Sequence, residues 1–161
     1  MKKTVYILFP LFCAILLYSN KASASGDFGL GFVLGSPSGF TAKYFLNREN
    51  AIAGGIGDAA GHGLYLYADY LIHFRGILPA REVSFFLGGG GAFHNYHRDR
   101  SAKTWGGDKN EKQLEGRMPF GINYVFEPIP IEVFLEIVPA LEIIPDVDFH
   151  LRAGIGARYY F

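Results

Sequence analysis

The sequence contains almost no cysteine and little charge. Cys13 is the only cysteine among 161 residues, so a disulfide-stapled secreted domain is excluded. Charged residues make up 19% of the chain and the formal net charge is zero, so no partner nucleic acid is expected. No uncharged apolar run approaches the roughly 18 residues that a membrane helix needs. After residue 24, no segment keeps the period of 3.6 residues that an amphipathic helix requires.

Aromatic residues and glycine are abundant instead. The chain is 16% aromatic, contains 21 glycines and is half hydrophobic, which excludes intrinsic disorder because disordered chains are poor in aromatics. A single domain of this size with so little charge has few residues for a surface that water wets on all sides. The composition therefore indicates a folded domain that contacts a solvent other than water.

The first 24 residues have the three parts of a secretory signal peptide. Lys2 and Lys3 form a basic start, residues 5–17 are apolar, and residues 22–24 are the small residues Ala-Ser-Ala. We expect cleavage after residue 24, which leaves residues 25–161 as the mature domain. Cleavage would remove the cysteine and three of the 15 basic residues, so 12 would remain against 15 acidic ones. The expected mature protein is slightly acidic and has no thiol.

The rest of the chain alternates apolar and polar residues with the period of two that is typical of β-strands. At its end, Phe149, Leu151 and Ile155 share one face with Phe161, opposite Arg152. Eight strands in about 137 residues suit the length of membrane-spanning strands with short connections. The predicted strands are 27–34, 40–46, 51–57, 64–73, 83–93 with an interruption at 88–91, 117–124, 131–137 and 149–161.

The two faces of these strands favour a membrane barrel over a soluble one. A soluble β-barrel that binds an apolar ligand remains the alternative fold, but its water-facing side should carry more charge. We therefore predict an all-β, eight-stranded antiparallel up-and-down transmembrane β-barrel, whose narrow lumen is filled by side chains. Its lumen would hold a balanced network of charges: Lys43, Asp69, Glu115, Arg117, Glu132, Glu136, Arg152 and Arg158.

The connections are expected to alternate between short periplasmic turns and longer outer loops. The turns are 47–50, 75–81 and 126–130, and the outer loops are 35–39, 58–63, 94–113 and 140–148. The longest loop, 94–113, is a candidate for contact with an extracellular ligand, because it carries net positive charge and a tryptophan. Its candidate residues are Arg98, Arg100, Lys103, Trp105, Lys109 and Lys112.

The C-terminal strand ends in Tyr159-Tyr160-Phe161, with apolar residues two, four and six positions before the terminal Phe. In these features the chain resembles the small eight-stranded outer-membrane barrels of bacteria, the class of the OmpA transmembrane domain and OmpX. The Gly-Ser-Pro-Ser-Gly segment 35–39 and the Phe-Leu-Glu-Ile-Val-Pro segment 134–139 are similar to an uncharacterised family of small barrels with spirochaete members. The resemblance implies that Tyr159 and Phe161 are read by the barrel assembly machinery, and that outer-membrane lipid surrounds a monomer.

No catalytic, cofactor or metal site is expected. The glycines at 29–31 and 88–91 are not followed by Lys-Ser/Thr or a helix, so they do not predict a phosphate-binding loop. His94 and His97 with Asp99 are an unspecific ligand set. We expect an integral outer-membrane protein with a structural or surface-interaction role rather than an enzyme. The alternatives are a small porin and a lipid A-modifying enzyme.

Overall fold

The computed structural model describes residues 26–58, 63–77, 79–80, 82–96, 111–126, 129–144 and 147–161. The predicted signal peptide, residues 1–24, lies outside this part of the chain. Among the described residues, no helix is long and apolar enough to cross a membrane. The regular structure consists of nine β-strands: β1 (Phe28–Gly35), β2 (Ser38–Phe45), β3 (Asn50–Asp58), β4 (Gly63–Arg75), β5 (Val83–Tyr96), β6 (Glu111–Arg117), β7 (Phe120–Phe126), β8 (Ile131–Ile144) and β9 (Asp148–Tyr160).

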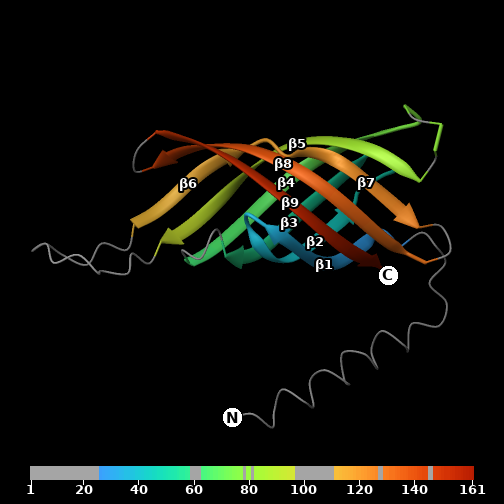
Figure 1. Cartoon of the computed structure of the whole chain (residues 1–161), viewed down its shortest axis with the longest axis horizontal. Helices are drawn as coiled ribbons and strands as arrows, with labels where there is room; N and C mark the ends of the chain where they lie inside the picture. Colours follow the sequence, from blue (N-terminus) through green and yellow to red (C-terminus); the bar gives the residue numbers. More distant parts are fainter. Residues whose placement is uncertain are drawn as a thin grey trace, which may run out of the picture.

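These strands form one antiparallel sheet that closes into a barrel (Figure 1). β1 pairs with both β2 and β9, and β4 pairs with β5, so the ring is complete. β6 and β7 both lie between β5 and β8, and together they occupy the place of a single strand. The barrel is therefore eight-stranded, and the predicted all-β antiparallel fold is confirmed.

The interruption between β6 and β7 lies at Met118 and Pro119. The N–H of Met118 donates to the carbonyl oxygen of Pro139 on β8 (2.9 Å), and the N–H of Gly88 on β5 donates to that of Pro119 (2.7 Å). Proline has no N–H to add to the ladder. Because hydrogen bonds continue on both sides, the interruption stays local and the barrel wall remains closed.

The predicted interruption at Gly88–Gly91 is wrong. β5 continues through these glycines, with Gly88 paired to Leu71 and Gly90 paired to Asp69 on β4. Strand pairing uses backbone groups, which glycine has in full. The neighbouring strands on both sides hold the segment extended, so the lack of side chains does not end the strand.

The predicted outer loops are also too long. The segment 140–148 is mostly strand, because β8 continues to Ile144 and β9 begins at Asp148, with Glu142 opposite Asp148. Similarly, β5 extends to Tyr96 and β6 begins at Glu111, so both ends of the predicted loop 94–113 are strand. In β8 the alternation continues past Pro139, which lies opposite the interruption in the neighbouring strand, where its missing N–H is not needed.

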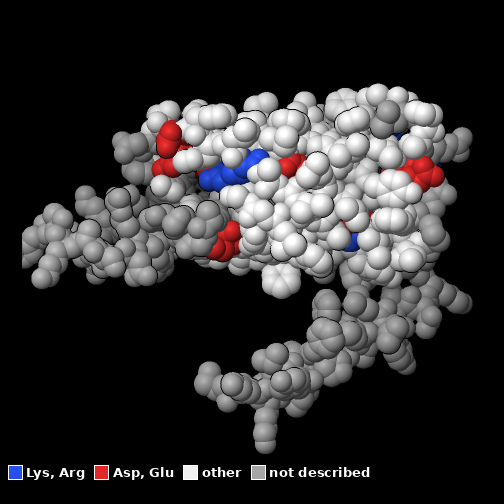
Figure 2. Space-filling model, in the orientation of Figure 1, with Lys and Arg blue, Asp and Glu red and all other residues white. Residues whose placement is uncertain are grey.

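The period of two separates an apolar outer surface from the interior. On β4, Leu64, Leu66 and Ile72 are exposed, whereas Tyr65 and Leu71 between them are buried. The flank of the barrel accordingly shows few charged side chains (Figure 2). This arrangement is the reverse of a soluble protein with an apolar core and a charged surface.

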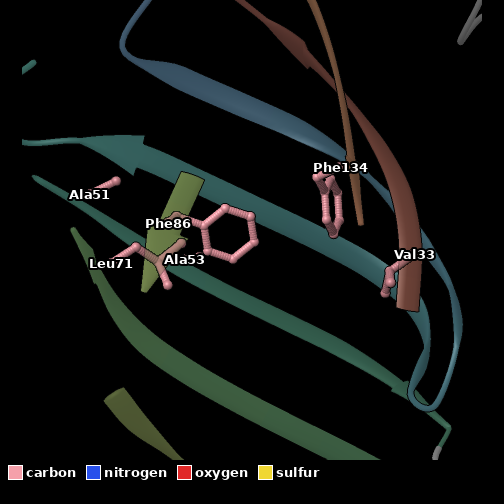
Figure 3. Close-up of a cluster of buried hydrophobic side chains, with 6 residues drawn as sticks. All are labelled: Val33, Ala51, Ala53, Leu71, Phe86 and Phe134. Carbon is pink, nitrogen blue, oxygen red and sulfur yellow. The ribbon is translucent and has the colours of Figure 1, made fainter. Parts of the chain in front are cut away.

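The interior is crowded. An apolar cluster from β1, β3, β4, β5 and β8 points into it (Figure 3). A Cβ added at Gly156 would lie 2.3 Å from the Phe134 ring, and one at Gly55 would lie 2.5 Å from the Tyr67 ring, so these positions require glycine. Added at Gly89 or Gly116, it would meet nothing within 4 Å. The apolar cluster shown in Figure 3 consists of Val33, Ala51, Ala53, Leu71, Phe86 and Phe134.

Candidate functional site in the barrel interior

The eight charged residues predicted for the lumen come from five strands, and the alternation points their side chains inward. Seven of them are no more than 6% exposed, and the side chain of the eighth, Arg152, is 11% exposed. Buried charges are costly unless they are paired and hydrogen-bonded, so their partners decide what the interior can do. The residues are Lys43 on β2, Asp69 on β4, Glu115 and Arg117 on β6, Glu132 and Glu136 on β8, and Arg152 and Arg158 on β9.

Glu132 is the centre of one group of contacts and is 0% exposed. The Lys43 ammonium lies 3.1 Å from both carboxylate oxygens, and the Arg158 guanidinium donates to Oε1 at 3.0 Å. The Tyr160 hydroxyl donates to Oε2. One carboxylate thus neutralises part of two positive charges and accepts from three side chains. We call Lys43, Glu132, Arg158 and Tyr160 the Glu132 group.

Thr41 extends this group. Its hydroxyl oxygen accepts from Arg158 Nη2 (3.0 Å) and from the Tyr67 hydroxyl (3.1 Å). The Arg158 guanidinium also lies 3.8 Å from the centroid of the Phe134 ring, a cation–π contact. Arg158 is therefore held on one side by a carboxylate, on another by a hydroxyl, and on its face by a ring.

Glu115 is the centre of a second group. Arg152 Nη1 donates to its two oxygens at 2.6 and 2.7 Å, and the Tyr65 hydroxyl donates to Oε1. The Tyr65 oxygen in turn accepts from Arg117 (3.1 Å), whose Nε lies 3.0 Å from Asp69 Oδ1. We call Tyr65, Asp69, Glu115, Arg117 and Arg152 the Glu115 group. These contacts connect β4, β6 and β9 through the interior.

Glu136 differs from the other seven charged residues. It is 6% exposed, yet with the rest of the described chain it forms no hydrogen bond or ion pair. A cation–π contact connects the two groups. The Arg117 guanidinium of the Glu115 group lies 4.2 Å from the centroid of the Tyr67 ring, and the Tyr67 hydroxyl donates to Thr41 beside the Glu132 group. Of the eight predicted lumen charges, seven therefore make direct ion pairs within the described residues. Glu142 on β8 is a further buried carboxylate, which lies 3.2 Å from His150.

Sequence reasoning missed the uncharged members of both groups. The alternation of the sequence places Thr41, Tyr65, Tyr67 and Tyr160 on the inward faces of their strands, but it predicts no partner for their hydroxyls. The signal available was position, since each lies on the same strand face as a predicted lumen charge. The partners themselves lie up to 117 positions away in the chain, and only the barrel brings them together.

The other predicted site residues lie elsewhere. Tyr159 and Phe161 are at the end of β9, with their rings packed edge to face at 5.0 Å. In the part of the chain that the structure describes, no group of three His, Asp or Glu could hold a metal ion. Lys112 belongs to β6. The remaining candidate loop residues, Arg98, Arg100, Lys103, Trp105 and Lys109, lie outside the described residues.

Replacing Tyr65 with phenylalanine tests the hydroxyl bridge in the Glu115 group. Glu115 and Arg117 would each lose a buried partner, so we expect the free energy of unfolding to fall by about 1–3 kcal/mol. Urea titration of the detergent-solubilised protein measures this change. Tyr70→Phe is the matched control because Tyr70 is 46% exposed. Equal effects of the two substitutions would contradict the bridge.

Comparisons with known proteins agree with the fold. No protein-family model matches the chain, and none of the curated proteins does. The chain is similar to a solved structure, the N-terminal β-barrel domain of Pseudomonas aeruginosa OprF, with a TM-score of 0.69 and 16% sequence identity. The match covers 85% of this chain and 100% of the OprF domain. At this identity the likeness establishes that the chain has the fold of an OprF-type barrel domain.

Proposed function

We propose that this chain is an integral β-barrel protein of the bacterial outer membrane, with a structural or surface-interaction role and an interior closed by its charge groups. The observation that carries this proposal is the Glu132 group. Lys43 on β2 reaches Glu132 on β8 although β1 and β9 lie between these strands, so the contact crosses the interior. Both side chains are 0% exposed. A lumen crossed by buried ion pairs is a poor route for solutes.

Membrane insertion is supported by the outer surface. The exposed faces of β1 and β9 carry Phe28, Leu30, Phe32, Leu151 and Ile155, each more than 40% exposed. Lipid is a favourable environment for such a surface, and barrel closure pairs the backbone groups that lipid cannot satisfy. Exposed aromatics near the end of the barrel that holds Phe161 are suited to a membrane interface. They are Tyr44, Tyr70, Phe74, Tyr124, Phe126 and Phe161.

Fractionation tests the membrane location. When the full chain is expressed in a diderm bacterium, the protein should sediment with outer membranes and should require detergent for release. On a denaturing gel, the unheated and boiled samples should migrate differently, because a closed barrel resists the detergent until it is heated. Recovery of the protein in the soluble periplasmic fraction would overturn the proposal.

Planar-bilayer recording tests the closed interior. Residues 25–161 reconstituted into a bilayer should give little or no steady conductance, because the charge groups fill the lumen. The matched sample is Glu132→Gln together with Arg158→Gln, which removes one charge of each sign and leaves two neutral side chains in their place. Conductance should rise in this variant. Large, stable channels in the unaltered protein would favour a porin.

A further inference from the structure

A cavity of about 740 Å³ is lined by residues at the end of the barrel that holds the C-terminus. Figure 1 marks the C-terminus at that end. Pockets for small molecules fall in this size range. The cavity lies beside the Glu132 group, since Tyr160 forms part of its wall. We call it the terminal basin. It is lined by Gly26, Asp27, Phe45, Leu46, Asn47, Arg48, Arg75, Glu82, Ser84, Val125, Phe126, Pro130 and Tyr160.

Two arginines of the terminal basin come from neighbouring positions. Arg48 is in the turn between β2 and β3, and Arg75 ends β4. The N–H of His73 donates to the carbonyl oxygen of Glu49 (2.6 Å), so the pairing of β3 with β4 continues into this turn. The guanidinium of Arg75 lies 5.5 Å from the centroid of the Phe45 ring, which supports its position at the edge of the basin.

These arginines differ from the arginines of the interior. Arg117, Arg152 and Arg158 each form an ion pair with a carboxylate. Arg48 and Arg75 are exposed, and neither forms an ion pair with any residue in the described ranges. Guanidinium groups bind carboxylates by paired hydrogen bonds, so two of them beside one cavity suit an anionic ligand.

The remaining lining narrows the class of ligand. Asp27 and Glu82 also lie in the basin, so its four charged residues are balanced and a second negative charge on a ligand would meet repulsion. The wall contributed by β7 and the following turn is apolar, with Val125 and Pro130. A singly charged ligand with an apolar body matches both the arginines and this wall.

We propose that the terminal basin binds a small monocarboxylate with an apolar body, its carboxylate held by Arg75 and Arg48 and its body against the β7 wall. This inference rests on the closed barrel and does not depend on membrane location or conductance. A ligand bound here would enter from the end of the barrel opposite the one where β5 ends at Tyr96 and β6 begins at Glu111. It would meet the Glu132 group at the Tyr160 side of the basin.

The probes are 3-phenylpropanoate, its uncharged analogue 3-phenylpropan-1-ol, and phenyl phosphate. Binding to residues 25–161, folded in lipid nanodiscs, is followed by NMR shifts of the backbone amides of Arg75 and Ser84. We expect saturable shifts and a dissociation constant for the carboxylate at least about tenfold below that of the alcohol, because a charge-assisted hydrogen bond is worth roughly that factor. Phenyl phosphate should bind more weakly than the carboxylate.

Variants of the arginines complete the test. Arg75→Gln should remove the preference for the carboxylate over the alcohol, and Arg75→Lys should retain part of it. Arg48→Gln should weaken it to a smaller extent. Asp148→Asn removes one exposed charge at the start of β9, at the other end of the barrel, and should change nothing. Equal affinity for carboxylate and alcohol, or a preference that survives Arg75→Gln, would overturn the proposal. Heat-dependent gel migration verifies that each variant remains a folded barrel.

Discussion

Glu132→Gln is expected to lower the free energy of unfolding by about 3–5 kcal/mol, the cost of breaking a buried ion pair by removing one partner. Glutamine keeps the shape of the side chain but removes the charge that Lys43 and Arg158 share. Both cations would stay buried, with Lys43 1% and Arg158 3% exposed. With Glu132 in place, two cations face one anion, so one positive charge is unbalanced. The substitution leaves both cations unbalanced, and the expected loss is therefore large.

Urea-induced unfolding in detergent micelles, followed by tryptophan fluorescence and gel migration, measures this loss. Glu49→Gln is the matched control because Glu49 is exposed in a turn, and it should change the free energy by less than about 0.5 kcal/mol. Adding Lys43→Met to Glu132→Gln should recover part of the stability, since it removes one of the unbalanced cations. Additive losses in the double variant would show that the pair does not act as a unit.

Gly156→Ala is expected to destabilise the barrel by about 1–3 kcal/mol through overpacking. The added methyl carbon would lie 2.3 Å from the Phe134 ring and 2.6 Å from the carbonyl oxygen of Phe32. Phe134 is 1% exposed and lies against the Arg158 guanidinium, so its ring cannot move without disturbing that contact. The methyl group must therefore displace either the ring or the backbone of β1.

Gly116→Ala is the control for this substitution, because a Cβ there meets no atom within 4 Å. It should change the free energy of unfolding by less than about 0.5 kcal/mol. Phe134→Ala combined with Gly156→Ala separates the two clashes. If the ring is the main obstacle, the double variant should be more stable than the sum of the single effects allows. Equal stability of Gly156→Ala and Gly116→Ala would show that the interior is less crowded than described.

Alternation in the sequence was sufficient to predict the sheet and the direction of its side chains. Each strand of a closed barrel has one face toward the interior, so the period of two assigns Lys43 and Glu132 to that face without further information. Their pairing depends on the stagger of β2 against β8, which no local pattern encodes. For the same reason the alternation predicts Glu136 in the charge network, whereas among the described residues it has no direct ion pair.

The ends of strands were predicted less well than their faces. The alternation predicts an interruption at Gly88–Gly91 and a strand that ends at residue 137. Hydrogen bonds on both sides hold these glycines, and β8 continues through Pro139, which lies beside the gap between β6 and β7. Glycine and proline mark turns where no neighbour compensates for them. In a closed sheet each strand has two neighbours, so these residues lose much of their meaning as local signals.

The pairing of β1 with β9 has a consequence for how the chain folds. Gly29 and Tyr160 are partners although they are roughly 130 positions apart, so this ladder closes the longest loop in the molecule and has the largest entropic cost. Local hairpins such as β1–β2 can form earlier, but their edges stay open until β9 arrives. β9 also brings Arg158 and Tyr160 to Glu132. The arrival of one strand therefore satisfies two open edges and a buried carboxylate in the same step, which makes closure cooperative.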